Sequence, residues 1–274
     1  MSAAAFALAL GSAFLHALWN LMLARERDPE AATAVAICAS VLVFAPVAAV
    51  LWDVDPRVWP FIAATSVLQL VYFALLSTAY RHAELSFVYP IARGLAPVLV
   101  LVVGVLALGT GATPSQSAGV CLVGLGVLLV RGLGAERDLV GGTLAVAIAV
   151  AIAAYTLVDN SGIQYANPIV YLELAMAPVA LAGLLLVAAL PRGAARIRAA
   201  ARPTPALAGV ISFAAYVLVL AALERAPAAS VAAVRETSVV IVAALAAPML
   251  GERVGPLRLV GAALVAGGIA LLVV

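Results

Sequence analysis

Long apolar runs, separated only by short polar segments, extend along the whole chain. A membrane-spanning helix needs about 20 predominantly apolar residues, and the sequence contains ten runs of roughly that length. They lie at residues 2–24, 32–51, 58–80, 84–107, 115–132, 139–161, 166–190, 204–224, 228–248 and 256–274. Each run is continuous rather than alternating, which favours helices over the strands of a membrane barrel. The pattern therefore predicts an all-α integral membrane protein with ten transmembrane helices.

The composition supports a membrane protein and excludes several other classes. Of the 274 residues, 66% are hydrophobic and 10% are charged, whereas soluble domains carry about 25% charged residues. A formal net charge of +2 is too small to favour a nucleic acid as partner. All fifteen cationic side chains are arginine, so the chain has no P-loop lysine and no Schiff-base lysine. Cys38 and Cys121 lie in apolar runs without metal or redox spacing, and we expect neither a metal nor a cofactor.

Arginine is distributed unequally between the two sides of the predicted membrane domain. Connections that follow odd-numbered runs carry eleven arginines, whereas those on the other side carry only Arg57 and Arg225. Because positively charged loops stay in the cytoplasm, both chain ends are predicted to lie outside. The use of arginine and alanine in place of lysine is typical of a GC-rich bacterium, so we expect a bacterial cytoplasmic (inner) membrane.

An internal repeat divides the chain into residues 1–132 and 139–274. A shift of 142 residues places Gly109, Pro114, Gly119, Gly126 and Arg93 on Gly251, Pro256, Gly261, Gly268 and Arg235. Each half contains five runs, an odd number, so the second half must insert upside down. Inverted five-helix repeats are typical of secondary transporters, with the substrate site near the midplane between the halves. Recurrence of packing glycines is the alternative, but it does not account for the aligned arginines.

The fourth run contains a charged residue near the membrane centre. Ionisable side chains inside spans are costly and mark functional sites, which makes Arg93 a candidate for substrate binding. Tyr89 lies one turn before it on the same helical face. Pro90, Gly94 and Pro97 predict that this helix is kinked or broken.

The ninth run contains an adjacent pair of opposite charges, Arg235 and Glu236. Neighbouring helical residues point about 100° apart, so the two side chains cannot face the same partner. The repeat places Arg93 opposite them, and we expect Glu236 to contact Arg93 or Arg235 in at least one transport state. A structural cluster that pins the two halves together is the alternative, although buried ion pairs do not reliably stabilise a fold.

Further polar and aromatic residues occur inside the apolar runs. His16, Trp19 and Asn20 form one stripe on the first helix, which either lines a cavity or makes an interhelical hydrogen-bond patch. The weaker candidates for the lining are Gln69, Tyr72, Tyr155, Ser212 and Tyr216, and Arg235 is a further candidate for substrate binding. Glu173 and His16, which titrates near neutral pH, join Glu236 as candidate proton carriers. Asp159, near the end of the sixth run, is predicted to be solvated.

Both halves end in a glycine-containing turn and a glycine-rich helix, GTGATPSQSAGVCLVGLGVLLV and GERVGPLRLVGAALVAGGIALLVV. With the ten inverted runs, these patterns resemble the EamA-type branch of the drug/metabolite transporter superfamily. The stretches LHALWN (15–20) and LSFVYPIARG (85–94) are similar to a narrower subgroup, some members of which are linked with phosphonate utilisation. The sequence departs from the pattern of this family in two ways. The turn of the first half lacks Gly-Glu-Arg, and both chain ends are predicted to be external, whereas many relatives are drawn with cytoplasmic ends.

The resemblance implies a secondary transporter, often an exporter of amino acids or related metabolites and sometimes proton-coupled. The leading hypothesis is alternating-access transport of a small zwitterionic or anionic solute, whose carboxylate or phosphonate Arg93 receives. Trp19, Tyr89 and Tyr155 would pack the rest of the solute, and Glu236 or His16 would exchange a proton.

Three other functions are weighed against transport of a water-soluble solute. A flippase for a lipid or lipid-linked metabolite is the nearest alternative, because the superfamily contains flippases. An intramembrane enzyme is not expected, since no DxxxD or HExxH lies inside a run and GxSxG does not occur. An accessory subunit would have no reason to keep charges inside its spans. The expected partners are a small solute and membrane lipid, and the sequence leaves open a monomer or a homodimer.

Overall fold

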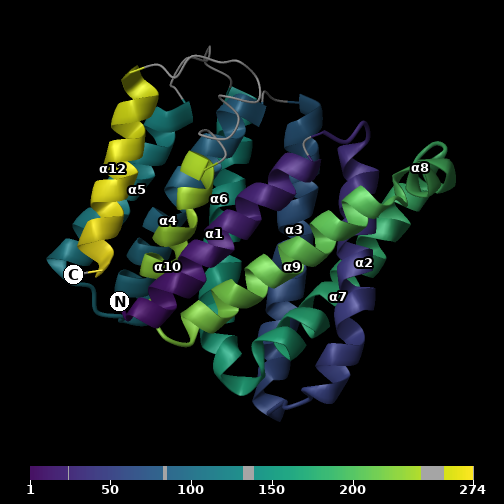
Figure 1. Cartoon of the computed structure of the whole chain (residues 1–274), viewed down its shortest axis with the longest axis horizontal. Coiled ribbons are helices and arrows are strands. Elements are labelled where there is room, and N and C mark those ends of the chain that lie inside the picture. Colours follow the sequence, from purple (N-terminus) through teal and green to yellow (C-terminus); the bar gives the residue numbers. More distant parts are fainter. Residues whose placement is uncertain (24, 83–84, 132–138, 242–255, 274) are drawn as a thin grey trace.

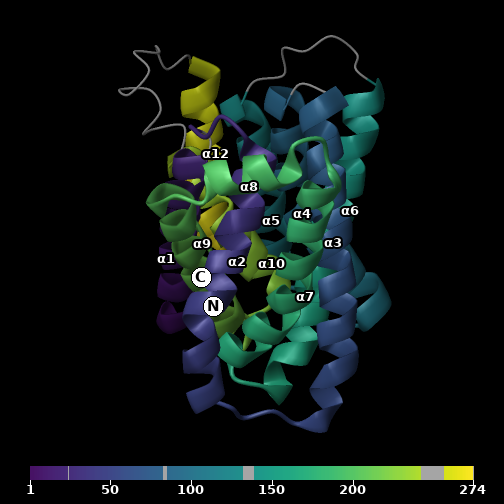
Figure 2. The same ribbon diagram turned by 90° about the vertical axis from the view of Figure 1, so that its right-hand side faces the viewer.

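The computed structural model describes residues 1–23, 25–82, 85–131, 139–241 and 256–273 as an elongated bundle of helices (Figures 1 and 2). The elements are α1 (Ala3–Leu23), α2 (Pro29–Val50), η1 (Pro56–Val58), α3 (Trp59–His82), α4 (Leu85–Leu108), α5 (Pro114–Arg131), α6 (Leu139–Gly162), η2 (Ile163–Tyr165), α7 (Pro168–Ala189), α8 (Gly193–Ala200), α9 (Pro203–Leu223), α10 (Ala228–Arg235) and α12 (Pro256–Val273). Within these described residues the only β-type pairing is an isolated bridge between Val54 and Ala166. The expected all-α class is therefore confirmed.

Nine of the ten predicted runs coincide with one helix each, and their bounds agree to within three residues. Seven described helices are long and apolar enough to cross a membrane. The apolar parts of α5 and α12 are shorter, Pro114–Leu129 and Leu259–Leu272. The ninth run continues beyond the described residues, so the count of ten stays a prediction.

The two chain ends lie together at one end of the bundle, and α8 lies at the opposite end (Figure 1). The amino group of Met1 donates a hydrogen bond of 3.4 Å to the carbonyl oxygen of Leu272. A common end for both termini is what an even number of crossings requires. Which end faces the cytoplasm stays a prediction from the arginine distribution.

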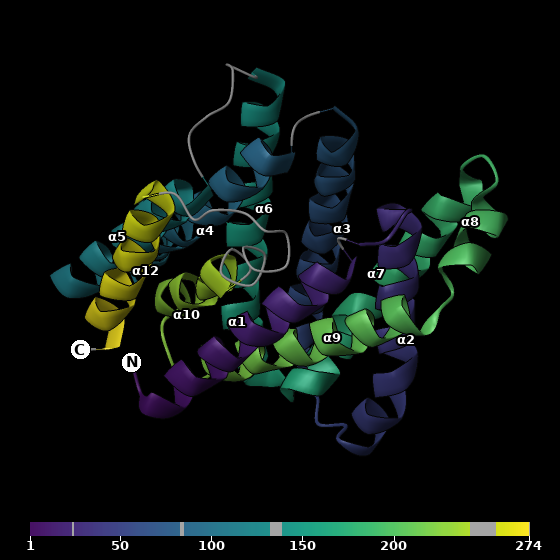
Figure 3. The same cartoon turned by 45° about the horizontal axis from the view of Figure 1, so that its top comes forward.

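Small residues allow the helices to approach closely. α1 lies beside α9 (Figures 1 and 3) and buries a stripe of small side chains spaced mostly four residues apart, namely Ala5, Ala9, Ser12, Ala13 and Ala17. Residues four apart share one helical face. In a membrane such stripes replace the hydrophobic effect with close van der Waals contact between helices.

The packing of the helices follows the internal repeat. α1 packs against α9, and its repeat counterpart α6 packs against α3, which is the counterpart of α9. In the same way α2 contacts α9 while α7 contacts α3. Such exchanged contacts are what a two-fold relation between inverted halves produces.

Repeat-related glycines meet between α5 and α12, which lie side by side (Figure 3). A Cβ atom added to Gly126 would lie 2.6 Å from the carbonyl oxygen of Gly261, and one added to Gly119 would lie 2.7 Å from that of Gly268. The 142-residue shift places Gly119 on Gly261 and Gly126 on Gly268. Gly126 therefore contacts the counterpart of Gly119, and Gly119 contacts the counterpart of Gly126. The two helices are antiparallel at this contact, and only a hydrogen atom fits between them.

The fourth run is one continuous helix, so the predicted break is wrong, and the alternative of a kink stays a prediction. α4 passes through Pro90 and Pro97 without interruption. A Cβ atom on Gly94 would lie 2.9 Å from the carbonyl oxygen of Gly124 in α5. Gly94 therefore serves close packing rather than a break, and neighbouring helices can support a membrane helix where proline removes a hydrogen bond.

The break occurs instead in the ninth run. α10 ends at Arg235, Glu236 forms a turn, and residues 237–241 are helical again. The backbone N–H of Glu236 donates to the carbonyl oxygen of Ala233 at 3.1 Å, and that of Val239 donates to the carbonyl oxygen of Glu236 at 3.0 Å. These bonds join residues three apart, as in a tighter 3-10 turn that often marks a functional position.

The connection between α7 and α9 contains α8, a short helix that the apolar pattern did not predict. Its sequence, GAARIRAA, combines alanine and arginine, which are strong helix formers. Arg192 before it has a left-handed backbone conformation, φ 57°, which turns the chain from α7 into α8.

Substitution of Gly268 by alanine is expected to force α12 away from α5, because the new Cβ atom would lie 2.6 Å from the carbonyl oxygen of Gly119. Overpacking costs about 1–3 kcal/mol, so the melting temperature of the detergent-solubilised protein should fall. Gly267→Ala is the matched control, since no heavy atom of the described residues lies within 4 Å of its Cβ position. Equal melting temperatures for the two variants would contradict the close contact.

Candidate functional site

A cavity of about 530 Å³ lies among helices of both halves. Its polar and aromatic lining consists of Ser12, His16, Trp19, Asn20, Thr33, Ser40, Gln69, Tyr72, Phe73, Arg93, Tyr155, Ser212, Phe213, Tyr216 and Arg235. Ten of the eleven residues predicted to bind substrate are in this wall. The eleventh, Tyr89, has a side chain outside the described residues. The structure thus brings the predicted set together, and its role in binding stays a prediction.

His16, Trp19 and Asn20 on α1 line the cavity. This position favours a cavity lining over an interhelical hydrogen-bond patch. The rings of His16 and Trp19 meet edge to face with their centroids 4.9 Å apart. The Asn20 side chain donates a hydrogen bond of 2.8 Å to the carbonyl oxygen of His16. The buried indole nitrogen of Trp19 has no hydrogen-bond partner among the described residues, so it offers a donor to a bound solute.

Three tyrosines from different helices form an aromatic wall. The ring of Tyr155 in α6 lies 6.0 Å from that of Tyr72 in α3 and 6.2 Å from that of Tyr216 in α9, between ring centroids. Both contacts are edge to face, the geometry that aromatic quadrupoles favour. The wall therefore joins α3 of the first half to α6 and α9 of the second.

Arg93 and Glu236 form a buried ion pair between the two halves. The Nε atom of Arg93 lies 3.0 Å from Oε2 of Glu236, and both side chains are about 4% exposed. Arg93 also donates from Nη2 to the Ser238 hydroxyl at 3.4 Å. The contact expected between the two repeats is thus present, and it engages the arginine that the sequence analysis assigned to the solute.

Arg235 takes a different direction from its neighbour Glu236. Its guanidinium carbon lies 5.4 Å from the centroid of the Tyr216 ring, and the residue lines the cavity although it is 5% exposed. Its Nε atom is buried and has no hydrogen-bond partner among the described residues. An arginine over an aromatic face gains cation–π energy but keeps its hydrogen-bond donors. Arg235 is therefore the cation on this wall that can accept an anionic group.

Asp159 is buried, so its predicted solvation is wrong. The residue is 1% exposed. One carboxylate oxygen accepts a hydrogen bond from the Tyr171 hydroxyl at 2.9 Å, and the other accepts one from the Tyr216 hydroxyl at 2.5 Å. Its position near the end of an apolar run suggested solvent. Its partners, 12 and 57 residues away, are brought to it only by the packing of α7 and α9 on α6.

Glu173, a predicted proton carrier, is buried in α7 and 8% exposed. Its Oε2 atom has no hydrogen-bond partner among the described residues, and the residue is not part of the cavity wall. The structure thus separates Glu173 from the site that contains Arg93, Arg235 and His16.

Two inverted halves around a polar cavity are the arrangement expected of a transporter, and the comparison with known families decides the assignment. The model of a family described as "EamA-like transporter family" matches residues 3–132 and again residues 139–274. The chain belongs to the EamA-like transporter family. This family consists of membrane transporters rather than enzymes.

A solved structure described only as "Crystal structure of protein" has a similar fold to this EamA-like transporter. The TM-score is 0.76 at 16% sequence identity, and the similarity covers 99% of this chain and 96% of the other. At this identity the likeness concerns the fold alone. No curated protein matches the sequence.

Different contacts join the two halves of the EamA-like transporter at its two ends. Near α8, Arg196 donates to Asp28 through two hydrogen bonds of 2.6 and 2.8 Å and to Glu30 through one of 2.9 Å. At the opposite end, the backbone N–H of Asp55 donates to the carbonyl oxygen of Tyr165 at 2.9 Å. Ion pairs therefore connect the halves at one end, and main-chain pairing connects them at the other.

The contact near α8 depends on ionised carboxylates. The hydrogen bonds from Arg196 hold the pKa of Asp28 below its ordinary value. The same bonds, with those to Glu30, raise the pKa of Arg196. Because the pKa of Asp28 is lower in the folded protein, its contribution is present above the ordinary carboxyl pKa and is lost as the pH falls through the lowered one.

Arg196→Ala is expected to lower the free energy of unfolding by about 1 kcal/mol at pH 7, the upper range for partly exposed ion pairs. The difference from wild type should shrink as Asp28 is protonated below the usual carboxyl range, at about pH 4 and lower. Melting temperatures measured as a function of pH check this. Arg198→Ala, an exposed arginine on the same helix, is the control. A pH-independent loss for Arg196→Ala would contradict the assignment.

Arg93→Ala is expected to leave the Glu236 carboxylate buried without its ion-pair partner. Breaking one side of a buried pair costs about 3–5 kcal/mol. The double variant with Glu236→Gln should regain most of that stability, because no uncompensated charge is then buried. Thermal unfolding of the two variants is the measurement, and a single variant as stable as wild type would disprove the structural role of the pair.

Proposed function

We propose that this EamA-like transporter is a secondary transporter that moves a small zwitterionic or anionic metabolite, such as an amino acid or related compound, across the bacterial cytoplasmic membrane. Residues 1–132 and 139–274 act as the two halves of one transport unit and expose the cavity alternately to each side. The observation that carries the proposal is Arg235, a buried cation on the cavity wall. It forms no ion pair with any described residue.

The chemistry of Arg235 favours an anionic group on the solute. A buried guanidinium with no counter-charge in direct contact is costly, and a carboxylate or phosphonate can accept two of its parallel N–H donors. The ring of Tyr216 supports one face of the guanidinium and leaves its edge for the solute. Arg93, the earlier candidate for this role, already contacts Glu236, so we assign the anionic group to Arg235.

The remainder of the cavity suits a small metabolite. Its volume of about 530 Å³ falls within the range of about 300–1,000 Å³ that small-molecule sites occupy. In the proposal Trp19, Tyr72 and Tyr155 pack against the solute, and Gln69 and Ser212 supply further polar contacts. Tyr89, Asn20 and His16 complete the proposed lining.

We place the α8 end in the cytoplasm and both chain ends outside. The arginine distribution supports this orientation, because basic connections stay on the cytoplasmic side. Net export, driven by an outward gradient of the solute itself, is the direction that the family resemblance suggests. In this orientation, Arg196 and its two carboxylate partners lie on the cytoplasmic side.

The test is solute counterflow in proteoliposomes loaded with amino acids, phosphonates or aromatic acids. Arg235→Gln should lower exchange of the transported solute at least tenfold, since hydrogen bonds to a charged group contribute about 1.5–3 kcal/mol. Arg225→Gln is the matched control, because Arg225 is exposed at the end of α9 and pairs with Glu224 at 2.5 Å.

Unchanged exchange in Arg235→Gln would show that this arginine does not bind the solute. Failure of every water-soluble solute to exchange would contradict the proposal as a whole. The same preparation would then be used in a flippase assay with lipid-linked substrates.

A further inference from the structure

Asp159 is a buried carboxylate whose direct contacts within the described part of the chain are with neutral side chains. Its oxygens accept hydrogen bonds from Tyr171 and Tyr216, and no ion pair involves it among the described residues. We propose that Asp159 binds the proton that crosses the membrane together with a monoanionic solute, and that Tyr216 links this proton site to Arg235. The inference rests on the proposed transport function and adds to it the proton site and the net charge of the solute.

Three acidic side chains are buried in the described helices, and only Asp159 combines the required properties. Glu236 lies 3.0 Å from Arg93, so its negative charge is balanced and its protonation would leave a buried cation unpaired. Glu173 is outside the cavity wall. Asp159 has no such counter-charge in contact, and its partner Tyr216 lies in the wall.

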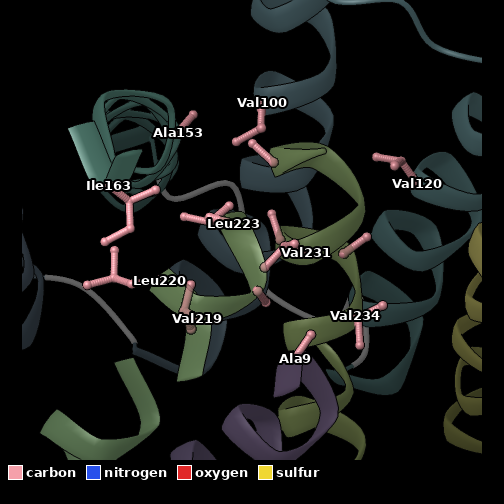
Figure 4. Packing of buried hydrophobic residues seen from close by; sticks show 14 of the residues in the cluster. Ala9, Val100, Val120, Ala153, Ile163, Val219, Leu220, Leu223, Val231 and Val234 are labelled. Carbon is pink, nitrogen blue, oxygen red and sulfur yellow. The ribbon is translucent and has the colours of Figure 1, made fainter. Parts of the chain in front are cut away.

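Asp159 lies between the cavity and a tightly packed apolar layer. On α6, Tyr155 lines the cavity and Asp159 follows one turn later, and Ile163, the first residue of η2, comes four residues after Asp159. On α9, Leu220 follows Tyr216 by one turn. Ile163 and Leu220 lie near each other in the apolar cluster (Figure 4). Asp159 is therefore adjacent to the cavity in this structure, and it would be exposed on the other side if the apolar layer opened. A group that carries a proton across the membrane must be reached from both sides in turn.

The ionisable groups around Asp159 come from four helices. They are Tyr155 on α6 itself, Tyr171 on α7, Tyr216 on α9 and Arg235 on α10, and the Thr65 hydroxyl of α3 adjoins the carboxylate. Tyrosines are neutral at physiological pH. The guanidinium carbon of Arg235 lies 5.4 Å from the centroid of the Tyr216 ring, so a positive charge is close to the Asp159 site.

Charge balance links the proton to the solute. In the empty cavity the buried charges of Arg93 and Glu236 cancel, as do those of Arg235 and Asp159. When a monoanion pairs with Arg235, the centre gains one negative charge in a region of low dielectric constant, where an uncompensated charge is costly. Protonation of Asp159 restores neutrality, so the anion and the proton bind together. A zwitterion would bind without this change.

Tyr216 provides the path for the proton. Its hydroxyl takes a proton from the cavity side and passes its own proton to the Asp159 oxygen 2.5 Å away. The carboxylate becomes a neutral acid and the tyrosine returns to its neutral form, so no further acid or base is consumed. Release to the other side reverses the step after the packed end has opened.

The experiment compares solutes that differ only in net charge, namely pyruvate with alanine and phenylpyruvate with phenylalanine. In wild-type proteoliposomes, a gradient of one pH unit, alkaline inside, should accumulate a transported monoanion up to about tenfold, the limit for one proton per solute. Asp159→Asn should retain counterflow of the monoanion but lose this accumulation, because its site is permanently neutral. Asp53→Asn, the same change at an exposed position, is the matched control and should behave like wild type.

Accumulation that survives in Asp159→Asn, or its loss in Glu173→Gln but not in Asp159→Asn, would overturn the proposed proton site. Counterflow of the zwitterions alone, without pH-driven accumulation, would also overturn the proposed proton site. The proposed transport function would not be affected by that result. Absence of counterflow for all solutes of the wider panel would count against the transport function itself.

A second measurement needs neither a solute nor a fully active variant. Infrared spectra of the wild-type protein recorded as a function of pH should contain the C=O band of a buried protonated carboxylic acid. The band should appear as the pH falls and be missing from Asp159→Asn, and its persistence in that variant would assign it to another group and contradict the proposal.

Discussion

Two adjacent opposite charges in one membrane-embedded segment determine how the centre of the molecule is built. Arg235 and Glu236 cannot remain without partners in a low-dielectric interior, and a regular helix would send them only about 100° apart. The tight turn at Glu236 lets each residue follow its own direction. Glu236 reaches Arg93 in the other half, and Arg235 reaches Tyr216 and the cavity. The link between the halves and the candidate binding site therefore arise at a single break in the backbone.

The rest of the bundle provides a frame of small residues around this charged centre. The glycines between α5 and α12 and the alanine stripe on α1 bring backbones together, which is how helices gain packing energy in lipid. The cavity lies where tyrosine, tryptophan and arginine replace such small side chains. The two sets of residues overlap on α1, where Ser12 belongs both to the small-residue stripe and to the cavity wall, while Trp19 faces the cavity.

The two halves share a fold but differ in their polar chemistry. Arg93 is paired with a carboxylate, whereas its repeat counterpart Arg235 lies over an aromatic ring. Asp159 and its two tyrosines all belong to the second half. The contacts between the halves also differ at the two ends, with ion pairs near α8 and main-chain pairing at the opposite end. One arginine is therefore held in an ion pair between the halves, while its repeat counterpart lies over an aromatic ring of the cavity wall.

The sequence by itself determined the helical class, the bounds of nine helices, the inverted repeat and most of the cavity wall. These features depend on local properties, namely the length of an apolar run and the cost of a polar side chain within it. Only the tertiary structure decided that Glu236 engages Arg93 and leaves Arg235 for the cavity. It also decided that the ninth run breaks rather than the fourth, and that Asp159 is buried against Tyr171 and Tyr216. These outcomes depend on partners from distant segments, because whether a charge is paired or a proline is tolerated is set by the helices packed around it.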